Sequence, residues 1–308
     1  MKTPPPNPAP PALIAGCGYL GTRLARRMAA EGPVLALTRS PASAEGLRRL
    51  GLRALAEDFD QPAANLDLPG DPGAVLYAAP PSGAGPEDLR LARFLESLGP
   101  ARPQVLLYVS TTGVYGDAGG REVDEESPLA PREDRSRQRL DAERRATAWC
   151  DERKVRCVIF RVPAIYGPHR LPLERLQRRE PVLREEDSGP GNRIHVDDLA
   201  GACLAALRGT ASGAFNLTDG CAMSMAAFSC RVADLAGLPR PPRVSWAEAQ
   251  TILSPGLLAF LRESRRVTSR RAQALGWTPV YRNPDDGIRA SLLEMGWAAA
   301  EGASSAGR

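Results

Sequence analysis

Lysine, histidine and aromatic residues are scarce in this chain of 308 residues. Lys2 and Lys154 are its only lysines, so the other 38 of its 40 basic residues are arginines, and 36 acidic residues reduce the formal net charge to +4. So small an excess, dispersed along the chain, is not the clustered basic face that nucleic-acid binding requires. Aromatic residues make up only 5% of the chain, so Leu, Val and Ala must fill most of the core.

Long apolar runs and closely spaced cysteine pairs are also missing. No stretch approaches the ~20 consecutive apolar residues that a membrane-spanning helix needs, and the Pro-rich residues 1–11 lack the apolar core of a signal peptide. The six cysteines show no CxxC spacing, and only His169 and His195 are available to join them, so no metal site is expected. We expect a soluble, cytoplasmic protein with reduced thiols, no membrane or nucleic-acid partner, and disordered ends at 1–11 and 298–308.

What the chain does contain is a regular alternation of short apolar runs and longer helical patterns. The apolar runs predict strands at 12–15, 34–38, 53–56, 74–79, 104–111 and 155–162, and the periodic segments predict helices at 19–31, 43–50, 86–98 and 135–153. The strands are uniformly apolar, as expected when both faces of a sheet are covered. This order predicts an α/β protein with a doubly wound parallel sheet, whose ligand crevice lies beyond the carboxyl ends of the strands.

The rhythm changes after residue 162. Residues 163–192 show little periodicity, 193–220 hold a helix (196–207) and a strand (214–217) that return to the sheet, and further helical patterns occupy 224–236, 246–250, 255–262, 269–275 and 284–295. We therefore expect a main domain over 12–162, with contributions from about 193–220. A smaller, mostly helical C-terminal lobe over 163–192 and 221–297 is expected to close over the crevice and contact a substrate.

A GxGxxG turn follows the first predicted strand and opens the first helix. Gly16 permits the tight turn, Gly18 lets backbone N–H groups approach a pyrophosphate, and Gly21 lets the helix pack closely on the strand. The helix N-terminus also favours an anion. With a strand before it and a helix after it, the turn predicts an NAD(P)-binding Rossmann fold. The predicted contacts of the turn are Gly16, Cys17, Gly18, Tyr19, Leu20 and Gly21.

The end of the second strand bears on which dinucleotide is bound. An NAD-preferring site places a carboxylate there for the ribose hydroxyls, whereas this chain has Thr38, Arg39 and Ser40. A guanidinium pairs well with a 2′-phosphate, so we expect NADP rather than NAD. The alternative is that Arg39 is one more arginine among many.

Two further strand ends carry candidate cofactor contacts. After the third strand, Asp58 is a candidate acceptor for the adenine amine and Phe59 a candidate ring to pack on the adenine, with a solvated acidic turn as the alternative. After the fourth strand, small residues leave room for the cofactor ribose, although an ordinary strand-end turn would look the same. These residues are Ala78, Ala79 and Pro80.

Six short stretches further along the chain carry a family likeness. They are VSTTGVYGD (109–117), DEESPLAP (124–131), RVPAIYGP (161–168), RIHVDDLA (193–200), FNLTD (215–219) and ALGWTP (274–279). With the glycine turn, they make the chain similar to the extended short-chain dehydrogenase/reductase superfamily, to its NAD-dependent epimerase/dehydratase family, and within it to the YeeZ-like branch. The resemblance covers roughly residues 12–295. It implies a monomer or homodimer that acts on a small molecule, such as a sugar nucleotide or another carbonyl compound, and it places Pro163 beside the cofactor.

The resemblance also implies a Tyr-x-x-x-Lys pair on the helix predicted at 135–153, in which the tyrosine is the acid/base and the lysine lowers its pKa. In this chain those positions fall on Arg135 and Arg139, and no tyrosine lies on the helix. A guanidinium stays protonated, so Arg135 cannot act as a base. Arg139 is expected to hold a ribose or phosphate as the family lysine does. Thr111 matches the family hydroxyl, and is expected to contact the cofactor and a substrate carbonyl.

Few residues can replace the missing tyrosine. Tyr166 and Tyr115 are motif tyrosines, and Tyr166 is our catalytic candidate, although structural roles are commoner for both. His195 is interpreted as a packing residue. Two functions stay open. The family resemblance favours an NAD(P)-dependent oxidoreductase or epimerase with non-standard acid/base residues, which is our prediction. The alternative, which the missing pair favours, is a non-catalytic NADP(H)-binding protein with a redox-sensing or regulatory role.

Overall fold

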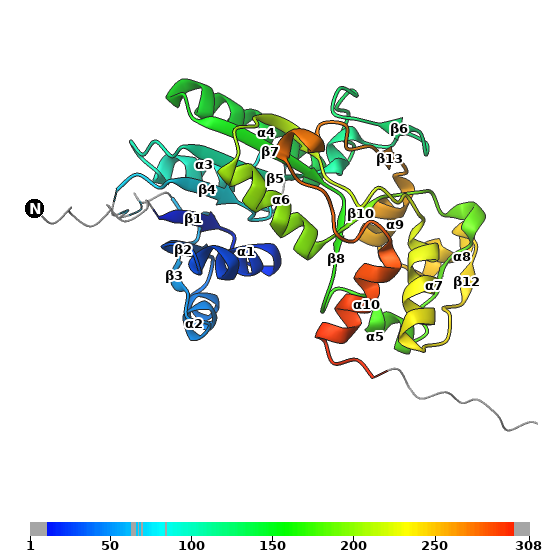
Figure 1. Cartoon of the computed structure of the whole chain (residues 1–308). Coiled ribbons are helices and arrows are strands. Elements are labelled where there is room, and N and C mark those ends of the chain that lie inside the picture. Colours follow the sequence, from blue (N-terminus) through cyan, green and yellow to red (C-terminus); the bar gives the residue numbers. More distant parts are fainter. Residues whose placement is uncertain (1–10, 63–65, 67, 69, 84, 299–308) are drawn as a thin grey trace, which may run out of the picture.

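Seven parallel strands form one central sheet in the computed structural model, which describes residues 11–62, 66, 68, 70–83 and 85–298 (Figure 1). The chain runs outward from β1 in both directions, so the strand order reverses between β1 and β4, where doubly wound folds bind their ligands. The predicted fold class is confirmed. The expected disorder of 1–11 and 298–308 falls almost entirely outside the described residues. The strand order is β11 (Gly213–Asn216), β7 (Arg156–Val162), β5 (Val105–Thr111), β4 (Ala74–Tyr77), β1 (Ala12–Ala15), β2 (Val34–Thr38) and β3 (Arg53–Ala56).

Helices cover both faces of the sheet, which explains why its strands are apolar on both sides. One face packs against α1 (Tyr19–Ala29), α2 (Pro41–Arg49), α6 (Val196–Arg208) and the 3-10 helix η3 (Ala272–Leu275). The other packs against α3 (Leu89–Ser97) and α4 (Asp134–Arg153). In β1, Ile14 belongs to the first layer, whereas Leu13 and Ala15 belong to the second.

A smaller lobe lies beyond the carboxyl ends of the strands and has a core of its own, which includes Phe228 and Ile288 (Figure 1). Its helices are α5 (Leu173–Gln177), α7 (Met225–Ala236), α8 (Trp246–Ile252), α9 (Pro255–Arg262) and α10 (Pro284–Glu294).

Short parallel strand pairs join distant segments: β8 (Ala164–Tyr166) with β10 (Arg193–His195), β9 (Val182–Leu183) with β12 (Arg243–Val244), and β6 (Glu122–Val123) with β13 (Arg266–Val267). Two 3-10 helices, η1 (Thr112–Tyr115) and η2 (Glu185–Asp187), complete the elements. The helix predicted at 269–275 is wrong, since only Ala272–Leu275 forms a 3-10 turn there.

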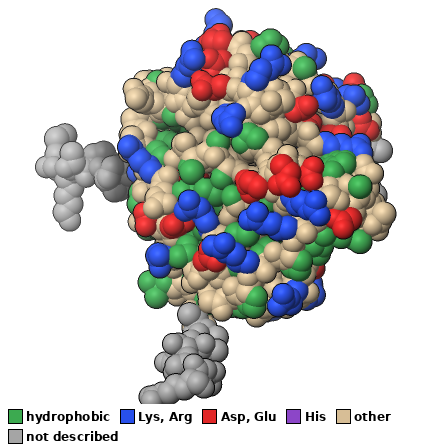
Figure 2. All heavy atoms as spheres, turned by 90° about the vertical axis from the view of Figure 1, so that its right-hand side faces the viewer, with side chains coloured by type: hydrophobic (Ala, Val, Ile, Leu, Met, Phe, Trp, Pro, Cys, Tyr) green, Lys and Arg blue, Asp and Glu red, His purple; other side chains and the backbone are tan. Residues whose placement is uncertain are grey.

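Basic and acidic side chains are interspersed on the face shown in Figure 2, without a continuous basic stripe. Across the described ranges, no helix combines the length and the apolar character needed to cross a bilayer. The same residues contain no group of three His, Cys, Asp or Glu side chains arranged to hold a metal ion.

Candidate cofactor and substrate site

The glycine turn is pressed against the carboxyl end of β4. Gly16 adopts φ +82°, and the backbone N–H groups of Gly16 and Cys17 both donate to the Leu37 carbonyl, at 3.1 and 3.0 Å. A Cβ atom on Gly16 would lie 2.2 Å from the backbone nitrogen of Ala79. A Cβ on Gly21 would lie 2.9 Å from the Gly16 carbonyl oxygen, so α1 packs directly on the turn. Both positions therefore admit only glycine without a shift of backbone.

Gly18, by contrast, borders open space, because a Cβ atom there would meet nothing within 4 Å. Gly18 is the N-cap of α1, gives the helix no side-chain cap, and is followed by a first turn without an acidic residue. The N–H groups at the start of α1 have no acceptor within the helix and form an anion site. A Cβ on Gly18 would project into this open space, here called the cradle, whose N–H donors fit the pyrophosphate of a dinucleotide.

The side chains of the turn face the protein rather than the cradle. Leu20 lies in the core, and the buried Cys17 thiol lies 3.9 Å from Thr22 Oγ1. Burial raises the pKa of this thiol to about 11, so it stays neutral. The Tyr19 hydroxyl donates to the Pro168 carbonyl at 2.7 Å. The turn therefore presents the backbone N–H groups of Tyr19 and Leu20 rather than their side chains, whereas the Cys17 N–H donates to Leu37 and is not free for the contact predicted for Cys17.

At the end of β2, only Arg39 presents a free polar side chain. Thr38 Oγ1 donates to the Ser40 carbonyl at 3.1 Å, and Ser40 Oγ accepts from the Ser43 N–H at 3.2 Å as the N-cap of α2. Arg39 is exposed. The pKa of Asp60 lies below its usual value, mainly because Arg90 donates hydrogen bonds to it and partly because of the nearby charge of Arg39. An exposed cation is therefore available at the end of β2.

The ends of β3 and β4 carry the residues predicted to lie at the adenine and at the ribose of the cofactor. Asp58 is half-buried, and its Oδ1 accepts from the Asp60 N–H at 3.1 Å. Phe59 is buried in the core, with its ring edge-to-face on Phe94 at a centroid distance of 5.3 Å. The idea that the Phe59 ring packs on adenine conflicts with this burial, because packing against α3 removes the ring from any ligand. The predicted Ala78, Ala79 and Pro80 follow β4 directly, with Ala78 half-buried, Ala79 buried and Pro80 exposed.

Arg139 on α4 links these strand ends. Its Nη1 donates to the Val109 carbonyl at 2.9 Å, to the Tyr108 hydroxyl at 3.2 Å and to the Ala79 carbonyl at 3.3 Å. Ala79 in turn touches the glycine turn at Gly16. Arg139 therefore joins the ends of β4 and β5 beside the glycine turn.

Two hydroxyl groups, those of Thr111 and Ser136, lie near Gly113, where β5 passes into η1 beside the start of α4; this region is called the corner below. Thr111 ends β5, is half-buried, and its Oγ1 accepts from the Gly113 N–H at 3.1 Å. A Cβ on Gly113 would lie 2.5 Å from Ser136 Oγ and 3.3 Å from Thr111 Cγ2, so the Ser136 hydroxyl lies beside Thr111. Sequence analysis missed Ser136, which comes one residue after the expected tyrosine position, because the family pattern assigns it no role. Pro163 follows Val162, the register partner of Thr111, and is half-buried.

Tyr166 is enclosed in the lobe and is not open to this corner. Its side chain is 2% exposed, and a Cβ on Gly287 of α10 would lie 2.3 Å from its hydroxyl. Its ring packs edge-to-face on His195 and Phe228. Burial raises the pKa of the hydroxyl far above its usual value. The predicted catalytic role of Tyr166 conflicts with this enclosure, and its place is structural.

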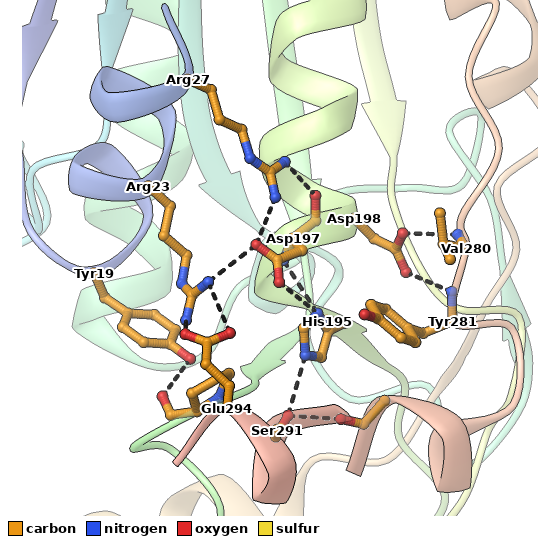
Figure 3. Close-up of polar contacts among 12 residues, drawn as sticks. Tyr19, Arg23, Arg27, His195, Asp197, Asp198, Val280, Tyr281, Ser291 and Glu294 are labelled. Carbon is orange, nitrogen blue, oxygen red and sulfur yellow. Dashed lines mark hydrogen bonds and ion pairs between the residues drawn. The ribbon is translucent and has the colours of Figure 1, made fainter. Parts of the chain in front are cut away.

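His195 is a satisfied packing histidine at the N-cap of α6 (Figure 3). Its Nδ1 accepts from the Asp197 N–H at 3.2 Å, so the proton lies on Nε2, which donates to Ser291 Oγ at 3.1 Å. Ser291 donates onward to the Gly287 carbonyl at 2.6 Å. Burial lowers the pKa of the imidazole to about 4, so the ring is neutral at physiological pH.

Acidification should therefore destabilise the protein through His195. His195 binds a proton with its ordinary pKa of 6.5 in the unfolded chain, but only near pH 4 in the folded chain. The contribution of the neutral His195 to the free energy of unfolding is therefore fully present above pH 6.5 and is lost as the pH drops toward 4. We expect His195 to account for a loss of about 2–3 kcal/mol between pH 7 and pH 4. Urea titrations at both pH values should show a smaller acid loss in His195→Asn, which keeps an N-cap acceptor. Equal acid losses in the two proteins would contradict this assignment.

Ion pairs fix α1 to both α6 and the lobe (Figure 3). Arg23 contacts Asp197 Oδ1 at 3.1 Å and Glu294 Oε1 at 2.6 Å, and Arg27 contacts Asp197 Oδ1 at 2.7 Å. Asp197 belongs to α6 and Glu294 to α10. The helix that begins at the glycine turn is thus joined to the last helix of the lobe.

Comparison with solved structures gives the same architecture. A functionally unknown conserved protein from Silicibacter pomeroyi DSS is 30% identical, with a TM-score of 0.80 over 93% of this chain and 99% of that one. MoeE5, solved in complex with UDP-glucose and NAD, is 23% identical, with a TM-score of 0.73 over 92% of this chain and 97% of that one.

Comparison with known sequences identifies the family. A 3-diazoavenalumate denitrifying reductase from a Streptomyces species is 32% identical over 107 residues, which are 34% of this chain and 35% of the relative. The chain thus spans about a third of the length of the curated relatives it matches. The model of the NAD dependent epimerase/dehydratase family matches residues 12–217, which include the glycine turn, Thr111 and Arg139. The chain therefore belongs to the NAD dependent epimerase/dehydratase family.

Proposed function

We propose that this protein binds NADP(H) in preference to NAD(H) at Gly16–Gly21, and acts as an oxidoreductase or epimerase on a small carbonyl compound or sugar nucleotide. The observation that carries the proposal is the cradle at Gly18, which has uncapped N–H donors beside open space. The family match and the NAD and UDP-glucose bound by MoeE5 support the ligand classes. Arg39, exposed at the end of β2, supports the preference for NADP(H).

The residues beyond the turn would orient the nicotinamide end of the cofactor. The small residues after β4 leave space for the ribose, Arg139 would donate to its hydroxyls or to a phosphate, and Pro163 would border the ring. A bound nicotinamide supplies the hydride acceptor or donor. Thr111 would donate its hydroxyl hydrogen to a substrate carbonyl, since its oxygen already accepts from Gly113.

Proton transfer is where this chain differs from what its family resemblance implies. No tyrosine lies on α4, Arg135 is exposed, and neither arginine can accept a proton at a working pH. Thr111 and Ser136 are the hydroxyls at this corner, and their ordinary acidity makes them donors of hydrogen bonds rather than bases. The same observation favours the second candidate function, a non-catalytic NADP(H)-binding redox sensor or regulator.

A cofactor titration tests both functions. We expect the wild type to bind NADPH at least tenfold more tightly than NADH, because a charge-assisted bond to a 2′-phosphate is worth about 1.5–3 kcal/mol. Arg39→Asp should abolish that preference. Arg49→Asp, which makes the same charge change at an exposed position of α2, is the matched control. The readout is the change in NAD(P)H fluorescence on binding, with calorimetry for the oxidised forms.

The outcomes separate the alternatives. Absence of binding at millimolar concentrations of every form would overturn both functions, and equal affinities for NADPH and NADH would overturn the preference. A sensor requires different affinities for NADP+ and NADPH, since a ligand without differential affinity shifts no equilibrium. Turnover of any carbonyl or sugar-nucleotide substrate would decide for the enzyme.

A further inference from the structure

Arg170 lies in the loop after β8, beside the glycine turn. Its guanidinium carbon lies 4.1 Å from the centroid of the Tyr19 ring, and Tyr19 is the first residue of α1. The Tyr19 hydroxyl donates to the Pro168 carbonyl, which ties the loop to the turn. Gly167 permits this approach, because it has φ +150° and a Cβ there would lie 2.6 Å from the Tyr19 hydroxyl. The loop thus holds the Arg170 cation at the start of α1.

The charge of Arg170 is uncompensated within the part of the chain that the structure describes. It forms no ion pair there, its backbone N–H donates to the Gly167 carbonyl at 3.0 Å, and its side chain is exposed. Arg23, whose guanidinium carbon lies 5.8 Å from the same ring, differs in being neutralised by Asp197 and Glu294 (Figure 3). Of the two arginines around Tyr19, only Arg170 has its charge available for a ligand.

The Arg170 guanidinium has N–H groups available for an anion. Among the described residues its side chain makes the contact with the Tyr19 ring but no hydrogen bond, so its N–H groups can donate to a ligand. A guanidinium pairs with phosphate oxygens through two parallel hydrogen bonds. The N–H groups at the start of α1 provide the partial positive charge of a helix N-terminus next to it.

We propose that Arg170 is a binding residue for the cofactor pyrophosphate and that the Tyr19 ring holds its guanidinium in place for this contact. The inference rests on the proposed function, since it needs a dinucleotide at the glycine turn. It adds a full charge from the substrate-side loop to a turn that otherwise binds through backbone N–H groups. It also makes the 167–170 loop part of the cofactor site.

The test compares NADPH affinities, from fluorescence titration, for the wild type and the variants Arg170→Gln, Arg170→Lys and Arg26→Gln. Arg170→Gln is expected to bind about tenfold more weakly, and with a smaller dependence on salt, because a screened charge has been removed. Arg170→Lys should lose less, since it keeps the charge but not the planar donors. Arg26→Gln, an equal charge change at an exposed position of α1, should bind as the wild type does. Melting temperatures establish that each variant is folded.

A parallel titration with uridine diphosphate shows which diphosphate Arg170 serves. A tenfold loss for NADPH with unchanged affinity for uridine diphosphate is the expected result. The proposal is overturned if Arg170→Gln binds NADPH as tightly as the wild type does, or if only the affinity for uridine diphosphate falls. Wild-type protein that binds no dinucleotide would instead overturn the proposed function, so the two failures are distinguishable.

Discussion

Replacing Glu143 by glutamine is expected to lower the free energy of unfolding by about 3–5 kcal/mol, because it leaves the Arg161 charge buried without a partner. Arg161 Nη2 lies 2.8 Å from Glu143 Oε2, and the two side chains are only 8% and 5% exposed. Ser110 Oγ donates to Glu143 Oε1 at 2.5 Å, so β5, β7 and α4 meet at this carboxylate. Urea denaturation of the wild type and the variant measures the difference.

The same arginine also connects β7 with η1 and β11 through the Tyr115 hydroxyl. Arg161 Nη1 donates to the Tyr115 hydroxyl at 3.1 Å, and that hydroxyl donates to Asn216 Oδ1 at 2.8 Å. Tyr115 is therefore structural in this protein. The exposed pair Arg240–Asp234 provides the control, because Asp234→Asn should cost less than about 1 kcal/mol. A loss below 1 kcal/mol in Glu143→Gln as well would show that the buried pair does not hold α4 on the sheet.

The second large effect is expected from the glycine turn, where two neighbouring glycines should behave oppositely. Gly18→Ala should fold, because the residue has φ −93° and its Cβ meets no atom within 4 Å, so the cost is at most that of a poorer N-cap, about 1 kcal/mol. Its methyl group would nevertheless occupy the pyrophosphate cradle. We expect NADPH affinity to fall by at least a hundredfold.

Gly16→Ala should fail at an earlier step. A Cβ there would lie 2.2 Å from the Ala79 nitrogen, and the φ of +82° is itself strained for alanine, so the turn must shift at a cost of about 1–3 kcal/mol from the conformation alone. Melting temperature and NADPH titration on both variants separate the two effects. If Gly18→Ala binds NADPH as the wild type does, the turn does not face the pyrophosphate.

The sheet and its helices could be predicted from the sequence because their signals are local. The apolar runs of β1, β2 and β3 match the predicted strands residue for residue. The start of α2 was placed two residues late, although Ser40 as N-cap and Pro41 at the first helical position mark it. The sequence does not predict the small sheets, because strands of two or three residues show no period. The strands β6 and β13 also pair across more than a hundred residues.

The residues of the candidate site likewise fall into those that local sequence predicts and those that depend on packing between distant segments. The glycine turn follows from spacing alone, whereas the places of Phe59 and Tyr166 depend on α3 and α10, which lie elsewhere in the sequence. Ser136 and Arg170 carry no local signal, since one is a serine in a charged helix and the other is one arginine of 38. Ser136 is recognised as a site residue because α4 packs against η1 in the structure. Arg170 is recognised because the 167–170 loop packs against Tyr19.

The joining of α1 to α10 through Arg23 has a mechanical consequence. If the lobe swings to close on a bound substrate, α10 is the natural pivot, because Glu294 is anchored to the helix that begins at Gly18. A rotation about a distant axis would first have to break the Arg23 ion pairs. A motion of the lobe that spares these pairs would therefore leave α10 in place against α1.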